Sequence, residues 1–232
     1  MSAHAAAFVG ALRAAFAPHH DAERAASMAA YMREIAPYLG LPSPLRAELE
    51  RGVIAERAPR GEAQVIATVD ALWAEPEREF QYTGLTLVRR HARRATPDFL
   101  SALDRWITTR SWWDTVDALA SHGVGGVLRK HPAQFALMDA WIDDAVLWRA
   151  RTALICQLRL GRATDVERLF AYCKKRMGDR EFFIRKAIGW ALREYSKVDG
   201  PAVEAFVEAH ADGLSGLSRR EALKWLARRP AA

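Results

Sequence analysis

Apolar residues recur along this chain at spacings of three and four positions, which is the period of an amphipathic α-helix. No sustained alternation with a period of two, bounded by Asn-Gly or Asp-Gly turns, marks a strand or a hairpin. Short breaks rich in Pro, Gly and capping residues separate the periodic segments. Helices are therefore expected at 5–16, 25–38, 64–74, 80–92, 98–107, 112–121, 134–141, 146–159, 165–176, 182–196, 201–209 and 218–228.

A weak internal repeat runs through these predicted helices. Phe80, Trp113, Trp148 and Phe183 lie near helix starts, at separations of 33, 35 and 35 residues. Two helices fit into each interval, which is the size of a helix-pair unit of the HEAT kind. Such units bury their apolar faces on their neighbours and stack into a solenoid that curves around a concave groove. The pattern predicts an all-α fold of this type, with an irregular four-helix bundle plus extra helices as the alternative.

Length and composition agree with one soluble globular domain over residues 1–232. Half of the 232 residues are apolar, which is enough for a substantial core, and no long linker interrupts the helices. The apolar stretches are broken by charges and stay below the roughly 20 residues that a membrane span needs. Two cysteines and seven scattered histidines show no metal-ligand spacing, so we expect a cytoplasmic protein without metal or cofactor.

The charge distribution is uneven. The net charge is +6, and the excess lies entirely in residues 101–232, because basic and acidic residues balance in the first hundred. Arginine supplies 28 of the 34 basic residues, and its planar guanidinium suits phosphate oxygens. By itself the charge fits nucleic-acid binding and an ordinary solvated surface equally well.

The segment SWWDTVDALA, residues 111–120, places two tryptophans beside two carboxylates. Ser111 and Asp114 match the capping-box pattern, which gives Asp114 a structural role. Trp113 and Asp117 are four residues apart and therefore share a helix face, while Val116, Leu119 and Ala120 form the stripe that faces the core. Asp117 lies beyond the first turn, where the helix dipole no longer favours a carboxylate. It is either a solvated or salt-bridged residue, or a residue with a chemical role.

The repeat brings further residues towards Asp117. Arg151 lies in the first turns of a helix one repeat later, and Trp190 lies two turns into the helix after that. If these helices line the concave side, Trp113, Asp117, Arg151 and Trp190 converge on one cleft with two indoles, one carboxylate and one guanidinium.

These residues resemble a known family, the DNA alkylation repair enzymes of the AlkD type. The resemblance runs from about Phe8 to Leu226. It implies a right-handed HEAT-like solenoid that holds duplex DNA in a basic concave groove. The implied activity is N-glycosylase removal of N3- and N7-alkylated purines, notably 3-methyladenine and 7-methylguanine. The resemblance to the family is found in four segments: TTRSWWDTVDALA (108–120), LWRARTALICQL (147–158), EFFIRKAIGWALREYSK (181–197) and, more weakly, MAAYMREIAPYLGLPSPLR (28–46).

The resemblance also implies roles for single residues. Asp117 matches the catalytic carboxylate of the family, and Trp113 and Trp190 match the tryptophans that line its cleft. Arg151 matches the arginine that contacts the DNA backbone, and Tyr31 matches a further aromatic of the cleft less closely. Further phosphate contacts are expected from basic residues beside the matched ones: Arg110, Lys186 and Arg193.

The chemistry of a cationic leaving group fits a single carboxylate. Cleavage of an N-glycosidic bond builds positive charge on the deoxyribose, as in glycoside hydrolysis. A cationic alkylpurine leaves as a neutral base, so no acid is needed to protonate it. Ionised Asp117 would stabilise the developing cation and orient water. We therefore predict a monomeric, monofunctional alkylpurine DNA N-glycosylase, a hydrolase acting on double-stranded DNA.

Three alternatives remain open. A non-catalytic HEAT-like DNA-binding or scaffolding protein would keep the fold, with the aromatics in the core and Asp117 salt-bridged. A glycosylase with an added lyase step would use Lys186 to form a Schiff base with the sugar. A metal-dependent nuclease is the weakest alternative, because the sequence contains no carboxylate cluster or His/Cys set for a metal.

Overall fold

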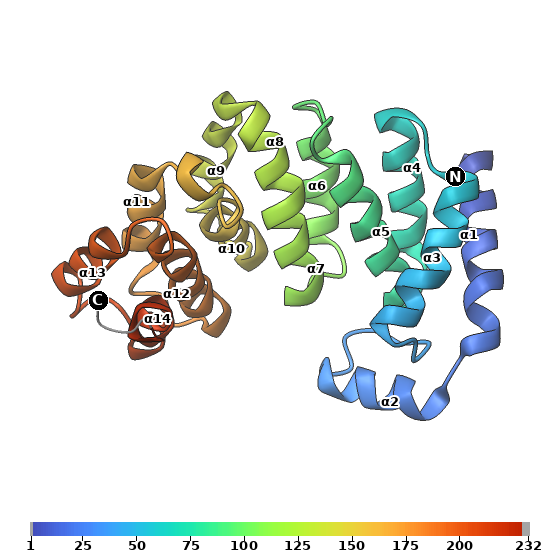
Figure 1. Ribbon diagram of the computed structural model, residues 1–232, viewed down its shortest axis with the longest axis horizontal. Coiled ribbons are helices and arrows are strands. Elements are labelled where there is room, and N and C mark those ends of the chain that lie inside the picture. The colour runs from blue at the N-terminus through green and yellow to red at the C-terminus, as the bar shows by residue number, and fades with distance from the viewer. Residues whose placement is uncertain (1, 229–232) are drawn as a thin grey trace. The chain divides into compact units, whose positions relative to one another are not determined.

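A computed structural model describes residues 2–228, and this part of the chain is helical, without a strand. Backbone contacts divide the chain into two compact units, of which the first ends at Ala102 and the second begins at Leu103. Helices close together in the chain pack on one another within each unit (Figure 1). The predicted all-α class of packed helix pairs is confirmed. The expectation of one domain over 1–232 stays a prediction.

Unit 1, up to Ala102, is built around α1, which packs against α3 and α4, while α4 packs against α5 (Figure 1). Its core contains the fully buried rings of Phe8, Phe16 and Phe80, and the last two lie 5.5 Å apart between ring centroids. The buried apolar residues of α1, α4 and α5 thus face neighbouring helices. The helices are α1 (Ala3–Phe16), α2 (Ala22–Tyr31), α3 (Ser43–Arg57), α4 (Gly61–Ala74) and α5 (Arg78–His91).

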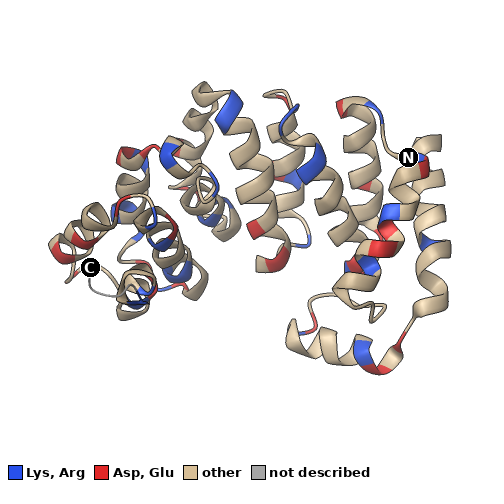
Figure 2. Cartoon of the chain, in the orientation of Figure 1, with Lys and Arg blue, Asp and Glu red and all other residues tan. Residues whose placement is uncertain are grey.

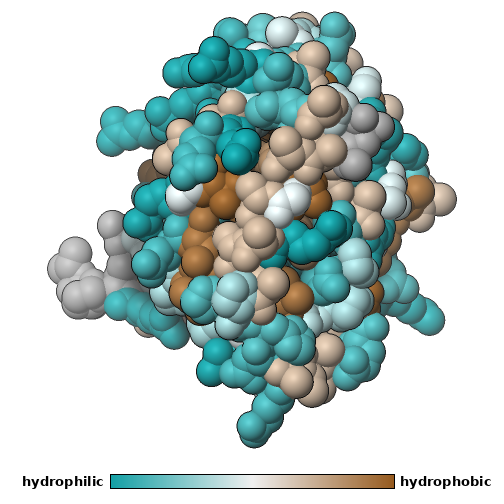
Figure 3. All heavy atoms as spheres, turned by 90° about the vertical axis from the view of Figure 1, so that its right-hand side faces the viewer, coloured by the Kyte–Doolittle hydropathy of each residue, from teal (hydrophilic) through white to brown (hydrophobic). Residues whose placement is uncertain are grey.

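The outer side of α1 is rich in alanine. Ala6, Ala7 and Ala14 are exposed on it, opposite the buried Phe8 and Leu12. Figure 3 views the molecule from this side, where apolar residues form a brown band between hydrophilic ones. Alanine side chains carry little apolar area each, so exposure costs this helix little.

A buried carboxylate fixes the loop that follows α2. Glu79 of α5 is fully buried and accepts hydrogen bonds from the backbone N–H groups of Leu39, Gly40 and Leu41, at 3.0, 3.0 and 3.3 Å. Gly40 has φ +83°, and a Cβ there would lie 2.3 Å from the carbonyl oxygen of Asp21. Only glycine therefore fits this turn, and the loop is tied to α5.

Unit 2, from Leu103 on, is centred on α10, which contacts α7, α9, α11 and α12. α12 also packs closely on α14, because a Cβ at Gly189 would lie only 2.5 Å from the Cβ of Glu221. The helices are α6 (Phe99–Thr108), which enters from unit 1, α7 (Trp113–Ala118), α8 (Gly125–Lys130), α9 (Phe135–Trp141), α10 (Leu147–Ile155), α11 (Val166–Arg176), α12 (Phe182–Ser196), α13 (Gly200–Ala209) and α14 (Gly216–Leu223).

The internal repeat read from the sequence matches helix starts. α5 begins at Arg78, α7 at Trp113, α10 at Leu147 and α12 at Phe182. The aromatic residues that defined the repeat therefore lie in the first turn of their helices, as predicted. Among the described residues, no helix is both long and apolar enough to cross a membrane.

Two helical segments were not predicted. No helix was expected between residues 38 and 64, but Ser43–Arg57 forms α3, with Val53 and Ile54 buried on its inner face. The glycine-rich SHGVGG segment was expected to end a helix. Instead, residues 119–124 form a π-helical turn that continues α7 into α8.

One predicted helix was too long. The apolar period indicated a helix over 25–38, but α2 ends at Tyr31. Arg33 and Glu34 have φ values of +59° and +57°, in the left-handed region that a helix of L-residues cannot continue through.

Replacing Glu79 with Ala is expected to lower the free energy of unfolding by about 3 kcal/mol, because three backbone N–H groups lose a charged acceptor. Urea denaturation measures this loss. Glu48→Ala is the matched control, since Glu48 is exposed on α3 and its replacement should change stability by less than about 0.5 kcal/mol. Equal effects of the two substitutions would contradict the anchoring role of Glu79.

Candidate active site

An open cavity of about 610 Å³ lies in unit 2 between α7 and α12. Three of the residues singled out in the sequence line it together: Trp113, Asp117 and Trp190. The predicted convergence of these three side chains is thus present in the structure. The remaining lining residues are Asp114, Ala118, Ser121, His122, Leu158, Arg159 and Glu194.

The start of α7 differs from the predicted capping box. Trp112, with an extended backbone, occupies the N-cap position. Ser111 donates its hydroxyl hydrogen to the carbonyl oxygen of Ile107 at 2.6 Å, so it closes the end of α6 and does not cap α7. The capping-box prediction was therefore wrong. Asp114 still lies in the first turn of α7, where the helix dipole favours an anion.

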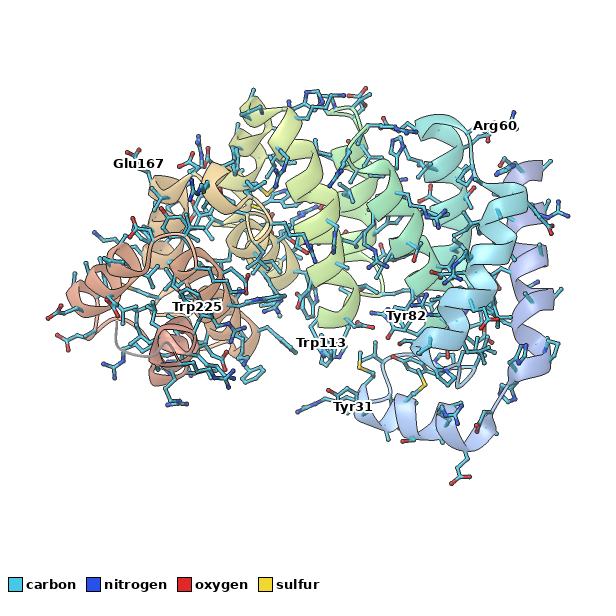
Figure 4. The ribbon with its side chains drawn as sticks, viewed as in Figure 1. Tyr31, Arg60, Tyr82, Trp113, Glu167 and Trp225 are labelled. Carbon is cyan, nitrogen blue, oxygen red and sulfur yellow. The ribbon has the colours of Figure 1, made fainter. Side chains whose placement is uncertain are left out.

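Burial of one face of α7 places Trp113 and Asp117 towards the cavity. Val116, Leu119 and Ala120 are fully buried, as predicted. Trp113 and Asp117 lie one turn apart on another face of the helix, and that face borders the cavity. Figure 4 shows Trp113 at the N-terminal end of α7.

A π-helical turn follows α7 and brings the chain against α10. Ser121 in this turn donates its hydroxyl hydrogen to the carbonyl oxygen of Asp117 at 2.7 Å. A Cβ at Gly125 would lie 2.4 Å from the carbonyl oxygen of Cys156, so the backbones approach as closely as glycine allows. π-Helical turns are rare and are frequent at functional sites. Here the turn connects α7 to α8 and contacts α10.

Asp117 and Arg151 form a two-point ion pair. The Nε of Arg151 donates to Oδ1 of Asp117 and its Nη2 donates to Oδ2, both at 2.8 Å. Its Nη1 donates to the carbonyl oxygen of Phe183 on α12. Arg151 is only 4% exposed. One guanidinium of α10 therefore connects α7 to α12 and fixes the orientation of the carboxylate.

An aromatic cluster packs beside this ion pair. The rings of Trp112, Trp148 and Phe183 lie 5.1 to 6.0 Å apart between centroids, and the guanidinium carbon of Arg151 lies 5.7 Å from the centre of the Phe183 ring. These rings exclude water from the guanidinium, and a lower local dielectric strengthens its interaction with Asp117.

Burial raises the pKa of Asp117 above its ordinary value of 3.8. The hydrogen bonds and positive charge of Arg151 oppose this shift, and the nearby negative charge of Asp114 adds to it. A carboxyl group with a raised pKa, a fixed orientation and a place in an open cavity is typical of a functional site.

Comparison with known proteins shows the family to which this chain belongs. The family described as DNA alkylation repair enzyme matches residues 12–226. The chain belongs to the DNA alkylation repair enzyme family. A solved structure, "Predicted DNA alkylation repair enzyme from Enterococcus faecalis", is similar with a TM-score of 0.82 and 30% identity, over 90% of this chain and 97% of that one. A comparison with curated proteins finds no match.

Family membership confirms the resemblance drawn from the sequence segments. The match covers both units and includes all residues of the cavity. The chain is therefore an enzyme of DNA repair, and its role concerns alkylated DNA.

Two residues predicted to contact DNA form ion pairs within unit 2. Lys186 and Arg193 of α12 both form ion pairs with Glu221 of α14, the first at 2.9 Å between Nζ and Oε1. The hydrogen bond from Lys186 lowers the pKa of Glu221, and Arg193 contributes further. Figure 2 shows basic and acidic residues close together on these helices. Phosphate binding by Lys186 and Arg193 stays a prediction.

Two other predicted DNA-binding residues are not among the described residues that line the cavity. Arg110 is exposed between α6 and α7, with a left-handed φ of +52°. Tyr31, the last residue of α2, is 77% exposed and belongs to unit 1, at the opposite end of that unit from Arg60 (Figure 4). Their contacts with DNA stay predictions.

The sequence interpretation missed Glu194, which lines the cavity one turn beyond Trp190 on α12. The signal was available, because Trp190 and Glu194 repeat the four-residue spacing of Trp113 and Asp117. Within residues 2–228, no group of three or more His, Cys, Asp or Glu side chains is placed to hold a metal ion.

A second open cavity, of about 520 Å³, lies between α13 and α14. Glu204, Glu208, Arg219 and Arg220 line it, and none of its described lining residues is aromatic. It therefore lacks the combination of indoles and a buried carboxylate that distinguishes the first cavity.

Replacing Arg151 with Met is expected to lower the free energy of unfolding by about 3 kcal/mol, because it leaves Asp117 buried without its partner. Arg149→Met is the matched control on the same helix. Arg149 binds Asp104 with the same two 2.8 Å contacts and binds Asp144 at 3.1 Å, but the three side chains are 29%, 28% and 25% exposed. Loss of these partly exposed pairs should cost about 1 kcal/mol or less each. Urea denaturation of both variants measures the two losses in the free energy of unfolding. Equal losses would contradict the buried role of Arg151.

Proposed function

We propose that this chain is a monofunctional DNA N-glycosylase that hydrolyses the N-glycosidic bond of N3- and N7-alkylated purines, such as 3-methyladenine and 7-methylguanine, in duplex DNA. One observation carries the proposal: Trp113, Asp117 and Trp190 line a single cavity, and Arg151 fixes the carboxylate. In this proposal the enzyme acts as a cytoplasmic monomer, without metal or cofactor.

The proposed transition state is cationic. As the bond between the sugar and the base breaks, positive charge develops on the deoxyribose. The alkylated purine already carries a positive charge and leaves as a neutral base, so no general acid is required. A preorganised anion near the sugar then supplies the main stabilisation. Asp117 fits this role because Arg151 holds its orientation before substrate binds.

The indoles of Trp113 and Trp190 also stabilise the positive charge of the transition state. Their electron-rich faces attract a cation by about 0.5 to 2 kcal/mol each. They also displace water, and the interaction of Asp117 with a cation strengthens as the local dielectric falls. The cavity combines these groups and is large enough to admit part of a nucleotide.

Arg151 is best explained as a positioning residue. Its Nε, Nη1 and Nη2 atoms all donate to protein oxygens, and its side chain is buried. We propose that phosphate binding rests mainly on exposed arginines, which predicts weak sequence preference and strong salt dependence. A lyase step through Lys186 gains no support, since this lysine pairs with Glu221 and is not among the described residues of the cavity.

A non-catalytic DNA-binding protein remains the second candidate, because Asp117 is salt-bridged, as that alternative expects. The tryptophans favour the enzyme. Trp113 and Trp190 are only half-buried and border an open cavity, whereas aromatics with a purely structural role would lie in the core.

Asp117→Asn is expected to reduce single-turnover release of 7-methylguanine from a defined duplex by about 10²- to 10³-fold, because a neutral amide no longer stabilises the cation. Retention of the duplex should stay near that of the wild type. Asp104→Asn is the matched control, since Asp104 also holds an arginine by two hydrogen bonds but lies outside the cavity lining. A wild-type chain that binds duplex and releases neither 7-methylguanine nor 3-methyladenine would favour the non-catalytic candidate.

The rate of base release should fall in acid. Burial raises the pKa of Asp117, so this carboxylate takes up a proton at a higher pH than an ordinary aspartate does. Activity needs the ionised form, and the acid limb of the rate should therefore lie above the usual pKa of 3.8. Single-turnover rates of base release between about pH 4 and 8 test this expectation. The rate of release from the duplex without enzyme is subtracted at each pH. A rate that stays constant over this range would contradict the assignment.

A further inference from the structure

Two tryptophan–carboxylate pairs of the same spacing face one cavity. Trp113 and Asp117 lie four residues apart on α7, and Trp190 and Glu194 lie four residues apart on α12. Residues at this spacing share a helix face. All four line the same cavity, so each of its two helical walls presents an indole with a carboxylate one turn beyond it.

The two carboxylates differ in how they are held. Both oxygens of Asp117 accept hydrogen bonds from the buried guanidinium of Arg151. Both oxygens of Glu194 accept from the Nζ of Lys197, at 2.6 and 2.7 Å, and the side chains of Lys197 and Glu194 are 43% and 27% exposed. A partly exposed pair of this kind contributes little stability and exchanges readily with water. Each carboxylate oxygen of Glu194 has a further lone pair, with which it can accept a hydrogen bond from a water molecule in the cavity.

The two carboxylates therefore suit different steps of the reaction. Both carboxylate oxygens of Asp117 are held by the buried guanidinium of Arg151, and Ser121 of the π-helical turn donates to the backbone carbonyl of Asp117. This arrangement suits an anion that stabilises charge without moving. A group that takes a proton must first orient the attacking water and then accept its hydrogen. The solvated Glu194 meets that requirement, and it lies across the cavity on a different helix.

We propose that Glu194 is the general base of the hydrolysis, a role that rests on the glycosylase function proposed above. The N-glycosidic bond breaks and both of its electrons leave with the cationic purine, which becomes neutral. The water oxygen forms a bond to the anomeric carbon of the sugar. One proton of that water passes to the Glu194 carboxylate and then to solvent, so charge and atoms balance.

Substitution of Glu194 is a clean test because its ion pair with Lys197 lies at the exposed end of α12. Loss of an exposed pair three residues apart on a helix costs less than about 1 kcal/mol, so the variant should fold. Glu204→Gln is the matched control: Glu204 is an exposed glutamate of α13 that lines the other cavity of unit 2.

The experiment measures single-turnover release of 7-methylguanine from a defined duplex by the wild type, Glu194→Gln and Glu204→Gln, with duplex retention and the unfolding midpoint for each. Glu194→Gln should slow release by about 10²-fold or more, the usual contribution of a general base. Its duplex retention and unfolding midpoint should stay at the wild-type level. Glu204→Gln should release base at the wild-type rate.

A second readout separates proton transfer from a structural role. Sodium formate should raise the rate of Glu194→Ala several-fold, because the small carboxylate enters the vacated position, and it should leave the wild type unchanged. If Glu194→Gln matches Glu204→Gln, or formate does not rescue Glu194→Ala, the inference fails while the glycosylase function stands. If the wild type itself releases no base, the proposed function fails and Glu194 loses its role with it.

Discussion

The two-point ion pair between Arg151 and Asp117 is the interaction on which the candidate active site depends. It joins residues 34 positions apart in the chain, and the same guanidinium reaches the backbone of Phe183 on a third helix. α7, α10 and α12 are thereby held in one arrangement around the cavity. The orientation of the carboxylate is set by the protein before any substrate arrives, which is what electrostatic catalysis requires.

This arrangement has an energetic cost. Two charges are withdrawn from water, and the raised pKa of Asp117 shows that Arg151 offsets only part of the desolvation. Its folded-state pKa exceeds the unfolded value, so the penalty is present at neutral pH and is relieved as the pH falls through that raised pKa. A purely structural position would gain stability from apolar residues of similar volume. Retention of the charge is understandable if the charge acts on a substrate.

The sequence by itself determined the local features of this protein. The three- and four-residue apolar period specified helices, and the repeated aromatics marked the starts of α5, α7, α10 and α12. The spacing of Trp113 and Asp117 placed both on one face of a helix. These inferences succeed because helix period and face depend only on residues within about two turns of each other. Similarity of longer segments then indicated the family, which the matched residues 12–226 confirmed.

Only the tertiary structure decided how these helices meet. The π-helical turn ends at Gly125, which packs closely against the backbone at Cys156 on the segment after α10. Arg151 became a buried partner of Asp117, and Glu194 came to face the same cavity. Each outcome depends on distances between helices, which side-chain packing sets and which no local period encodes.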